Sequence, residues 1–273
     1  MTIYNSQIIQ LCILIPCYKN FNGLVTSIKS INYDINNYLI IVIDDGNKDP
    51  ITKNRINQEL LFPVNIEIIR SEQNIGITKA LNKGLEFIYL NLSVNYIARL
   101  DCGDVCTPNR FYTQTKFLEV NPDIHLVGSW CYFKDPQSGV AFKYITPTVH
   151  KYIKRGMNFR NVFIHPTVMW RVSALNKLLY PEKYPFAEDY GLFYDMISKV
   201  KSAIINQFLV TCELNYSGIS MSKRSIQLKS RLKVIADYGK NNFLFFLGAI
   251  KLMILMGFPY QFILLIKKNF YKV

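Results

Sequence analysis

Residues 96–110, YIARLDCGDVCTPNR, are the stretch that decides the fold. A short apolar run of strand length ends abruptly there at two carboxylates, Asp101 and Asp104. Because open α/β sheets bind ligands at the carboxyl ends of their strands, this pattern favours a binding site. Two carboxylates three residues apart repel each other unless a hydrogen-bond donor or a cation lies between them, and hard divalent cations prefer oxygen ligands. The alternative is a solvent-exposed turn in which Asp104 begins a helix and Pro108 rigidifies it.

The residues before this stretch alternate between strand-like and helix-like patterns. Strands are expected at the apolar runs 11–16, 39–43 and 64–69, and helices at 22–31 and 77–89, where apolar residues recur at helical spacing. Strands that alternate with helices predict an α/β fold with a mostly parallel sheet and right-handed crossovers. This is, in general terms, a nucleotide-binding architecture.

A second pair of acids, Asp44 and Asp45, follows the expected strand 39–43 in the sequence IVIDDGNKD. A carboxylate at a strand end can accept hydrogen bonds from ribose hydroxyls or from a pyrimidine N–H, and Gly46 lets the chain turn sharply beside it. The alternative is that Asp44 only ends the strand and that Asp45 and Gly46 only form a turn. No GxGxxG or GxxxxGK(S/T) motif follows an expected strand, which disfavours dinucleotide oxidoreductases and P-loop enzymes.

Composition and charge indicate a folded chain with an anionic partner. Half of the 273 residues are apolar and the mean hydropathy is +0.10, which favours contact with lipid or with another partner. The formal net charge is +13, and from residue 217 to the end ten Lys or Arg residues stand against a single acid, Asp237. Such a basic segment indicates an anionic surface. No nucleic acid partner is expected, because the charges lie among long apolar runs rather than with stacking aromatics.

The cysteines are expected to be reduced thiols of a cytoplasmic protein. The six, at positions 12, 17, 102, 106, 131 and 212, lack the second pair or the nearby histidine that a zinc site needs. A secretory signal peptide is not expected, because the first basic residue is Lys19 and the apolar run Leu11–Pro16 is too short.

The C-terminal segment combines basic residues with apolar runs. Residues 222–240 interleave Lys and Arg with apolar side chains, and residues 243–266 are almost wholly apolar. Because Lys251 lies in the middle of the second run and Gly257 and Pro259 interrupt it, we expect helices that lie in the membrane interface with their basic faces toward anionic lipid. A helix packed in the core and a membrane-spanning helix are the alternatives.

Taken in order, these segments resemble the family 2 glycosyltransferases with the GT-A fold. The resemblance is carried by IPCYKN, IVIDDGNKD, NIGITKALNKG and ARLDCGDVCTPNRF, followed by NPDIHLVGS at 121–129, VFIHPTVMWR at 162–171 and FAEDYGLFYDM at 186–196. It covers about residues 10 to 220, and the order of the motifs is more specific than any one of them. The resemblance implies an enzyme that moves one sugar from a nucleotide donor to an acceptor with inversion.

The resemblance also implies donor-binding roles for residues at the ends of the expected strands and helices. Pro16 and Tyr18 would border the nucleotide, Asp44 and Asp45 would contact the base or ribose, and Gly76, Lys79 and Arg99 would lie near the diphosphate. Asp101 would be the first acid of the family's Asp-x-Asp motif, which holds the donor and its divalent cation.

The metal site is where this sequence departs from the family's pattern. Gly103 stands at the third position of the motif, where the family usually has an acid. We expect Mg²⁺ or Mn²⁺ with Asp101 and Asp104 as ligands. The alternative is that Arg99 and Lys79 neutralise the diphosphate instead of a metal.

Glu188 and Asp189 are the candidate catalytic residues. In AEDYGLF, apolar neighbours can raise the pKa of a carboxyl group toward that of a useful base, so Asp189 is the expected base and Glu188 its support or substitute. The alternative is a helix whose first-turn acids only interact with its dipole. His165, in VFIHPTVMW, is either a hydrogen-bonded structural residue or, by its family-like position, part of an acceptor site.

These patterns predict a catalytic domain at 1–220, with a nucleotide-sugar half at 1–110 and an acceptor half at 111–220, followed by a membrane-associating tail at 221–273. The expected function is inverting transfer of a sugar, with UDP-sugar donors favoured, to a surface polysaccharide or a lipid-linked oligosaccharide. The expected location is peripheral, at the cytoplasmic face of the membrane. The alternative function is a non-catalytic, membrane-associated nucleotide-sugar-binding or scaffold protein.

Overall fold

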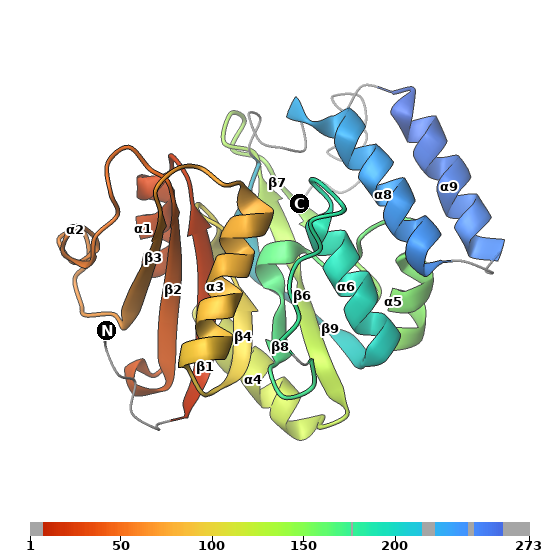
Figure 1. Cartoon of the computed structure of the whole chain (residues 1–273). Helices are drawn as coiled ribbons and strands as arrows, with labels where there is room; N and C mark the ends of the chain where they lie inside the picture. Colours follow the sequence, from red (N-terminus) through yellow and green to blue (C-terminus); the bar gives the residue numbers. More distant parts are fainter. Residues whose placement is uncertain (1–7, 176, 215–221, 240–242, 259–273) are drawn as a thin grey trace.

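The computed structural model describes residues 8–175, 177–214, 222–239 and 243–258 (Figure 1). Its sheet has the strand order β3-β2-β1-β4-β8-β6-β9-β5, with β7 paired to β6. The strands are β1 (Ile9–Cys17), β2 (Tyr38–Asp45), β3 (Ile66–Ser71), β4 (Val94–Arg99), β5 (Val105–Cys106), β6 (Ile124–Lys134), β7 (Ala141–Tyr144), β8 (Met169–Arg171) and β9 (Lys201–Glu213).

Helices cover both faces of this sheet. They are α1 (Phe21–Lys29), α2 (Lys53–Asn57), α3 (Ile77–Asn91), α4 (Arg110–Val120), α5 (His150–Gly156), α6 (Glu188–Lys199), α8 (Arg224–Tyr238) and α9 (Phe243–Met256), with short 3₁₀ turns η1 (Ile35–Asn37) and η2 (His165–Thr167).

The first four strands confirm the parallel sheet expected from the sequence. β1 pairs in parallel with β2 and β4, and β2 pairs in parallel with β3. Both faces of these strands are covered, which explains why they read as continuous apolar runs rather than as alternating ones. Cys12 and Leu14 of β1 point to the core on the side of α3 and α6, whereas Leu11 and Ile13 point to the core on the side of α1 and α4.

The second half of the sheet is mixed. β8 is antiparallel to both β4 and β6, and β6 is parallel to β9. The alternative interpretation of Asp101 and Asp104, a turn in which Asp104 begins a helix, is wrong in one respect, because no helix begins at Asp104. It precedes the short strand β5, which pairs with β9, and α4 begins only at Arg110.

α8 and α9 lie side by side at the end of the molecule away from β1–β3 (Figure 1). Leu228, Val234 and Ile235 of α8 and Leu252 of α9 are buried in the same apolar cluster as α3 and α6. α8 is therefore a packed core helix, one of the alternatives for this segment. The expected domain boundary at 220 falls in residues 215–221, and part of the apolar run, 259–266, also lies outside the described residues. None of the described helices is long and apolar enough to cross a membrane.

Candidate active site

The ends of β1, β2, β3 and β4 meet at one edge of the sheet. Cys17 of β1 is in register with Asp44 of β2, and Asp45 is in register with Ser71 of β3. β4 ends beside β1 at Arg99, two residues before Asp101. Because parallel strands share a carboxyl edge, residues that are far apart in the sequence line one surface.

Asp44 is buried, and both of its carboxylate oxygens accept hydrogen bonds from the protein. Oδ1 accepts from the backbone N (2.9 Å) and the side-chain Nδ2 (2.7 Å) of Asn47. Oδ2 accepts from the backbone N of Ile51 (3.0 Å) and from Arg70 Nη1 (3.2 Å). Asp44 therefore organises the loop between β2 and α2, whatever it contributes to a ligand.

Asp45 is also buried, and it ties β2 to the beginning of α3. Its Oδ1 accepts from the backbone N of Ile75 (2.8 Å), and its Oδ2 accepts from Asn74 Nδ2 (2.8 Å) and the backbone N of Gly76 (3.2 Å). Gly76 has φ +84°, and the space where a side chain would begin is open. Among the described residues no side chain caps α3, so the first N–H groups of this helix are available to an anionic ligand.

The remaining expected donor contacts lie around this edge. Pro16 is buried, and its carbonyl accepts from the Cys102 thiol (3.1 Å), which links the β1 end to the acidic stretch. Tyr18 is 43% exposed and is open to a ligand. Lys79 is exposed and forms a long ion pair with Glu182 at 4.0 Å. Because an exposed ion pair is weak, the ammonium group can leave Glu182 for a diphosphate.

Arg99 is fully buried and is the centre of the site's hydrogen bonds. Its Nη1 donates to the carbonyls of Leu14 and Leu100, and its Nη2 donates to Asp101 Oδ1. Its Nε donates to His165 Nε2 (3.2 Å). Asp101 is thus the one carboxylate paired with this permanently charged guanidinium.

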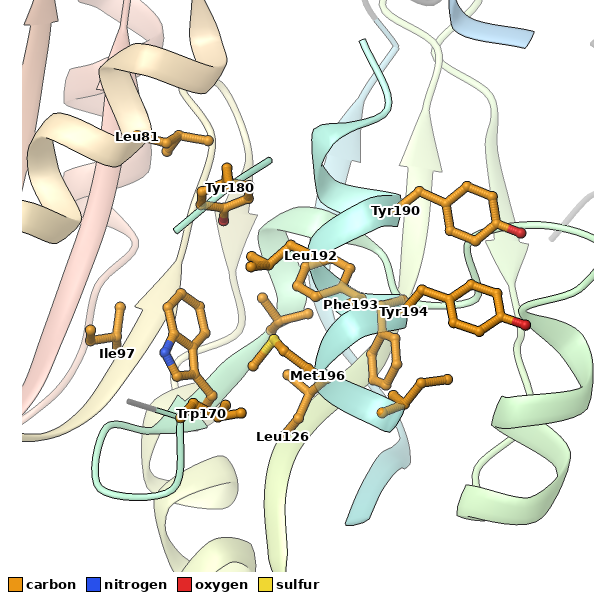
Figure 2. Packing of buried hydrophobic residues seen from close by; sticks show 14 of the residues in the cluster. Leu81, Ile97, Leu126, Trp170, Tyr180, Tyr190, Leu192, Phe193, Tyr194 and Met196 are labelled. Atoms are coloured by element: carbon orange, nitrogen blue, oxygen red, sulfur yellow. The ribbon is translucent and has the colours of Figure 1, made fainter. Parts of the chain in front are cut away.

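His165 is held as a neutral imidazole. Because a guanidinium only donates, His165 Nε2 is unprotonated, and its one lone pair faces both Arg99 Nε and the Tyr180 hydroxyl (2.8 Å). Burial, with a contribution from the charge of Arg99, lowers the pKa of His165 to about 4. Asn82 of α3 fixes Tyr180 by a reciprocal pair of bonds, accepting from the Tyr180 backbone N (2.7 Å) and donating to its carbonyl (2.9 Å). Figure 2 shows Tyr180 between Leu81 of α3 and Leu192 of α6.

Glu188 and Asp189 form the first turn of α6, as expected. Asn161 Nδ2 donates to Asp189 Oδ2 (2.8 Å). Glu188 is buried, and in the described part of the chain its Oε2 has no hydrogen-bond partner. Burial, with smaller contributions from the charges of Asp189 and Asp101, raises the pKa of Glu188 to about 7. Asp101, which follows β4, is therefore near enough to the acids of α6 to influence the pKa of Glu188.

The local backbone at the start of α6 is unusual. Phe186, two residues before Glu188, has φ +63°, which side-chain-bearing residues rarely adopt. Gln227 of α8 donates from Nε2 to the Phe186 carbonyl (3.0 Å), and the Asp237 carboxylate of α8 accepts from the Tyr184 hydroxyl (2.7 Å). α8 thus holds the segment that leads into the acids.

The expected metal site offers few free oxygen ligands. Asp101 has one oxygen bonded to Arg99, and Gly103 offers no side chain. Asp104 is buried, burial raises its pKa well above the ordinary value, and its Oδ1 accepts from the backbone N of Glu213 (3.1 Å). Within residues 8–258 as described, no three His, Cys, Asp or Glu side chains form a metal-binding group. The second carboxylate oxygen of Asp101 can bind Mg²⁺ or Mn²⁺, but the substrate phosphates would have to supply further ligands.

Sequence reasoning did not single out Asn82, Asn161 or Tyr180. Asn82 had a usable signal, because a polar residue beside Leu81 on the apolar face of an expected helix needs a buried partner. Asn161 and Tyr180 lie in irregular segments, where no periodicity indicates which side chain turns inward.

Residues 12–179 match the model of the family described as glycosyl transferase family 2. The chain belongs to this family. An uncharacterised glycosyltransferase of Methanocaldococcus jannaschii is 31% identical over 191 residues, covering 68% of this chain and 64% of that protein. The UDP-Gal:alpha-D-GlcNAc-diphosphoundecaprenol beta-1,3-galactosyltransferase of Escherichia coli is 29% identical over 158 residues, covering 56% of this chain and 54% of that protein. The matches thus span less than two thirds of these relatives.

A solved structure agrees with the fold. The mannosyltransferase PcManGT of Pyrobaculum calidifontis, in complex with GDP-Man and Mn²⁺, superposes with a TM-score of 0.61 at 13% identity, covering 87% of this chain and 66% of that one. At this identity the likeness establishes the GT-A-like fold that the sequence predicted, and the site residues rest on the geometry given above.

Proposed function

We propose that this family 2 glycosyltransferase transfers a sugar from a nucleotide sugar, with UDP-sugar favoured, to a surface glycan or lipid-linked acceptor, with inversion. The observation that carries the proposal is the convergence of the Arg99–Asp101 pair at the end of β4 with Glu188 and Asp189 at the start of α6. One side provides charge for a diphosphate and the other provides a base, which are the two requirements of a direct displacement.

The donor is expected to lie along the carboxyl edge of β1, β2 and β4. Tyr18 lies at its nucleotide end, while Lys79, the open N-terminus of α3 and buried Arg99 supply positive potential for the diphosphate. Bound together with the donor, Mg²⁺ or Mn²⁺ would neutralise charge on the leaving group, and Asp101 is the residue that would hold it.

Asp189 is the proposed base. Asn161 fixes one of its oxygens, which leaves the other to accept the proton of the acceptor hydroxyl. Glu188, buried beside the half-buried Asp189, keeps the negative charge of the pair low, because burial and the neighbouring charge of Asp189 both favour the protonated form of Glu188. One carboxylate suffices, since an inverting displacement forms no covalent intermediate.

We also propose that the enzyme works peripherally, at the cytoplasmic face of a membrane. α9 exposes Phe243, Phe246, Leu247, Ile250, Met253 and Ile254, which are 40–73% exposed. These residues recur at helical spacing and form one stripe, which we call the α9 stripe. α8, which packs against α9, carries Arg224, Lys229, Arg231 and Lys233, and basic residues combined with an apolar stripe suit an anionic bilayer surface. The Escherichia coli relative, whose name specifies a diphosphoundecaprenol acceptor, supports a lipid-linked substrate.

The test is release of nucleoside diphosphate from a panel of nucleotide sugars, with and without Mn²⁺, in the presence of membrane lipid extract. Asp189→Asn should lower the rate by about 10²–10⁴-fold. The matched control is Asp195→Asn, which removes a surface acid on the same helix that pairs with Lys199. Absence of release with every donor, or equal rates for wild type and Asp189→Asn, would favour the non-catalytic binding protein instead.

A further inference from the structure

Three cations from separate parts of the chain lie near one another around α9. Arg160 lies between α5 and η2, Arg231 lies in the middle of α8, and Lys251 lies in α9. We call them the cation cluster. α8 and α9 run antiparallel, because Arg224 Nη2 donates to the carbonyl of Leu255 (2.8 Å) while a Cβ on Gly248 would lie 3.6 Å from Ile235 Cδ1. Arg231 and Lys251 both fall between these two contacts, at the same level.

Close contacts hold the segment that leads into Arg160 against α9. A Cβ on Gly248 would lie only 1.9 Å from the carbonyl oxygen of Asn158, so α9 touches this segment directly. Lys251 Nζ lies 6.0 Å from the ring centre of Phe159, the neighbour of Arg160. Two tyrosines of α6 hold the same segment, with the Tyr190 hydroxyl donating to the Met157 carbonyl and the Tyr194 hydroxyl donating to Asn158 Oδ1 (3.2 Å). Figure 2 shows both rings on the side of α6 opposite Leu192 and Met196.

The cluster has no acid to balance it. Arg160 donates to two neutral oxygens, the Tyr144 hydroxyl (3.0 Å) and the Ile145 carbonyl (3.5 Å). Across the described ranges, no carboxylate comes within 4.0 Å of any of the three cations. Burial lowers the pKa of Lys251, and the charges of Arg160 and Arg231 lower it further. Three like charges held together in this way are stabilised by binding an anion.

The cluster is connected along the chain to the two other features that an acceptor needs. On one side, Lys251 follows Ile250 of the α9 stripe and lies one turn from Leu247 and Ile254. On the other side, Arg160 is followed by Asn161, which donates to the proposed base Asp189 (2.8 Å). An apolar surface, a cationic site and a base therefore follow one another, in the order of the lipid, phosphate and sugar of a lipid-linked acceptor.

We propose that Arg160, Arg231 and Lys251 bind the phosphate or diphosphate that joins the acceptor's sugar to its lipid. The inference rests on the proposed function and narrows its acceptor to one of the two classes. Guanidinium groups suit this ligand, because they donate in a planar fork that matches phosphate oxygens. The apolar stripe receives the lipid and the cluster fixes the phosphate, so that the sugar hydroxyl reaches Asp189.

The test measures binding to neutral phosphatidylcholine vesicles that carry either a polyprenyl diphosphate or phosphatidylglycerol at equal surface charge. Wild type should prefer the diphosphate vesicles by about tenfold, a difference of about 1.4 kcal/mol. Arg160→Gln, Arg231→Gln and Lys251→Gln should each remove most of this preference. Lys229→Gln is the matched control, since it removes an exposed charge from the same α8 helix and should keep the preference.

Two further measurements separate the explanations. Thermal unfolding should be unchanged or shifted upward in Lys251→Gln, because repulsion is relieved, so a marked downward shift would indicate a structural role and contradict the inference. Inorganic pyrophosphate should compete with the vesicles only in large excess, and competition at equal concentration would indicate a soluble anion instead. An equal effect of Lys229→Gln would show that the preference arises from general electrostatic attraction, which would contradict the inference.

Failure of this inference is distinguishable from failure of the proposed function. A thermal shift with UDP and GDP reports the donor site and should be the same in all four variants. If nucleotide binding is present and the diphosphate preference is absent, only the acceptor inference fails. If the preference is present and no nucleotide sugar binds or reacts, only the proposed function fails.

Discussion

Glu188 places a carboxyl group inside the site at the first position of α6, with one oxygen that lacks a partner among the described residues. Its pKa is raised from the ordinary value of 4.5 to about 7, so the folded protein holds a proton that the unfolded chain releases. The free energy of unfolding should therefore fall as pH rises from about 4.5 to 7 and then level off. Activity should rise over the upper part of the same range, because Glu188 loses its proton there and adds negative charge beside the proposed base.

Glu188→Gln should move the acidic limb of the kcat/KM profile to lower pH. It should also raise stability relative to wild type above pH 7, by on the order of 1–3 kcal/mol. Rate profiles and urea unfolding at pH 5 and pH 8 measure the two effects. Glu59→Gln, which changes an exposed glutamate next to α2, should leave both profiles as in wild type. A rate profile that keeps its limb near pH 7 in Glu188→Gln would assign that limb to another group.

At the scale of elements, the contact between α9 and the end of α5 depends on Gly248. A Cβ there would lie 1.9 Å from a backbone oxygen, and backbone cannot rotate away as a side chain can. Gly248 and Leu252 are the buried residues of α9, so Gly248→Ala should loosen this helix without unfolding the core. We expect α9 amides to exchange with solvent more readily by about 1–3 kcal/mol, while α6 amides keep their protection.

The matched change is Gly257→Ala, where the nearest atom would lie at an ordinary contact distance of 3.4 Å. It should leave α9 exchange unaltered. Hydrogen exchange followed by mass spectrometry resolves the two helices. Unchanged exchange in Gly248→Ala would mean that α9 is held by contacts other than this one.

At the scale of the whole molecule, membrane binding should depend on the α9 stripe and not on the integrity of the core. Removing everything after Ser222 would delete α8, which buries Leu228, Val234 and Ile235 and holds the segment before Glu188 and Asp189, the proposed catalytic acids. Such a truncation would confound unfolding with loss of binding. Replacing two stripe residues, Phe246→Ser with Ile254→Ser, changes the surface alone.

The double variant should bind anionic vesicles at least about tenfold more weakly than wild type, because each apolar side chain taken out of water contributes roughly 1.5–3 kcal/mol. Leu61→Ser is the control, since Leu61 is the most exposed of the large apolar residues and follows α2, at the opposite end of the molecule (Figure 1). Co-sedimentation with vesicles measures the partition. If Leu61→Ser weakens vesicle binding as much as the stripe variant does, membrane binding does not depend specifically on the α9 stripe.

Much of the N-terminal half of the fold could be predicted because its determinants are local. The runs 11–16, 39–43 and 64–69 became β1, β2 and β3, since strands buried on both faces must be continuously apolar. The Glu188–Asp189 helix start was also found, because apolar spacing and a motif agree there. Asp44 shows the limit of such reasoning. Its ligand role stays a prediction, while its four hydrogen bonds inside the protein depend on a loop and on Arg70 of the next strand.

Short-range order along the chain therefore specifies the alternation of strands and helices, the acids at the strand ends, the family and the excess of positive charge near the C-terminus. Long-range contacts specify the rest: the antiparallel insertion of β8 beside β4, the buried Arg99–His165–Tyr180 contacts, and the meeting of Arg160, Arg231 and Lys251. Hydrophobic periodicity reports which side of an element is buried, because it depends on near neighbours. Partners far apart in the chain are chosen by three-dimensional packing of those buried sides, which no local pattern encodes.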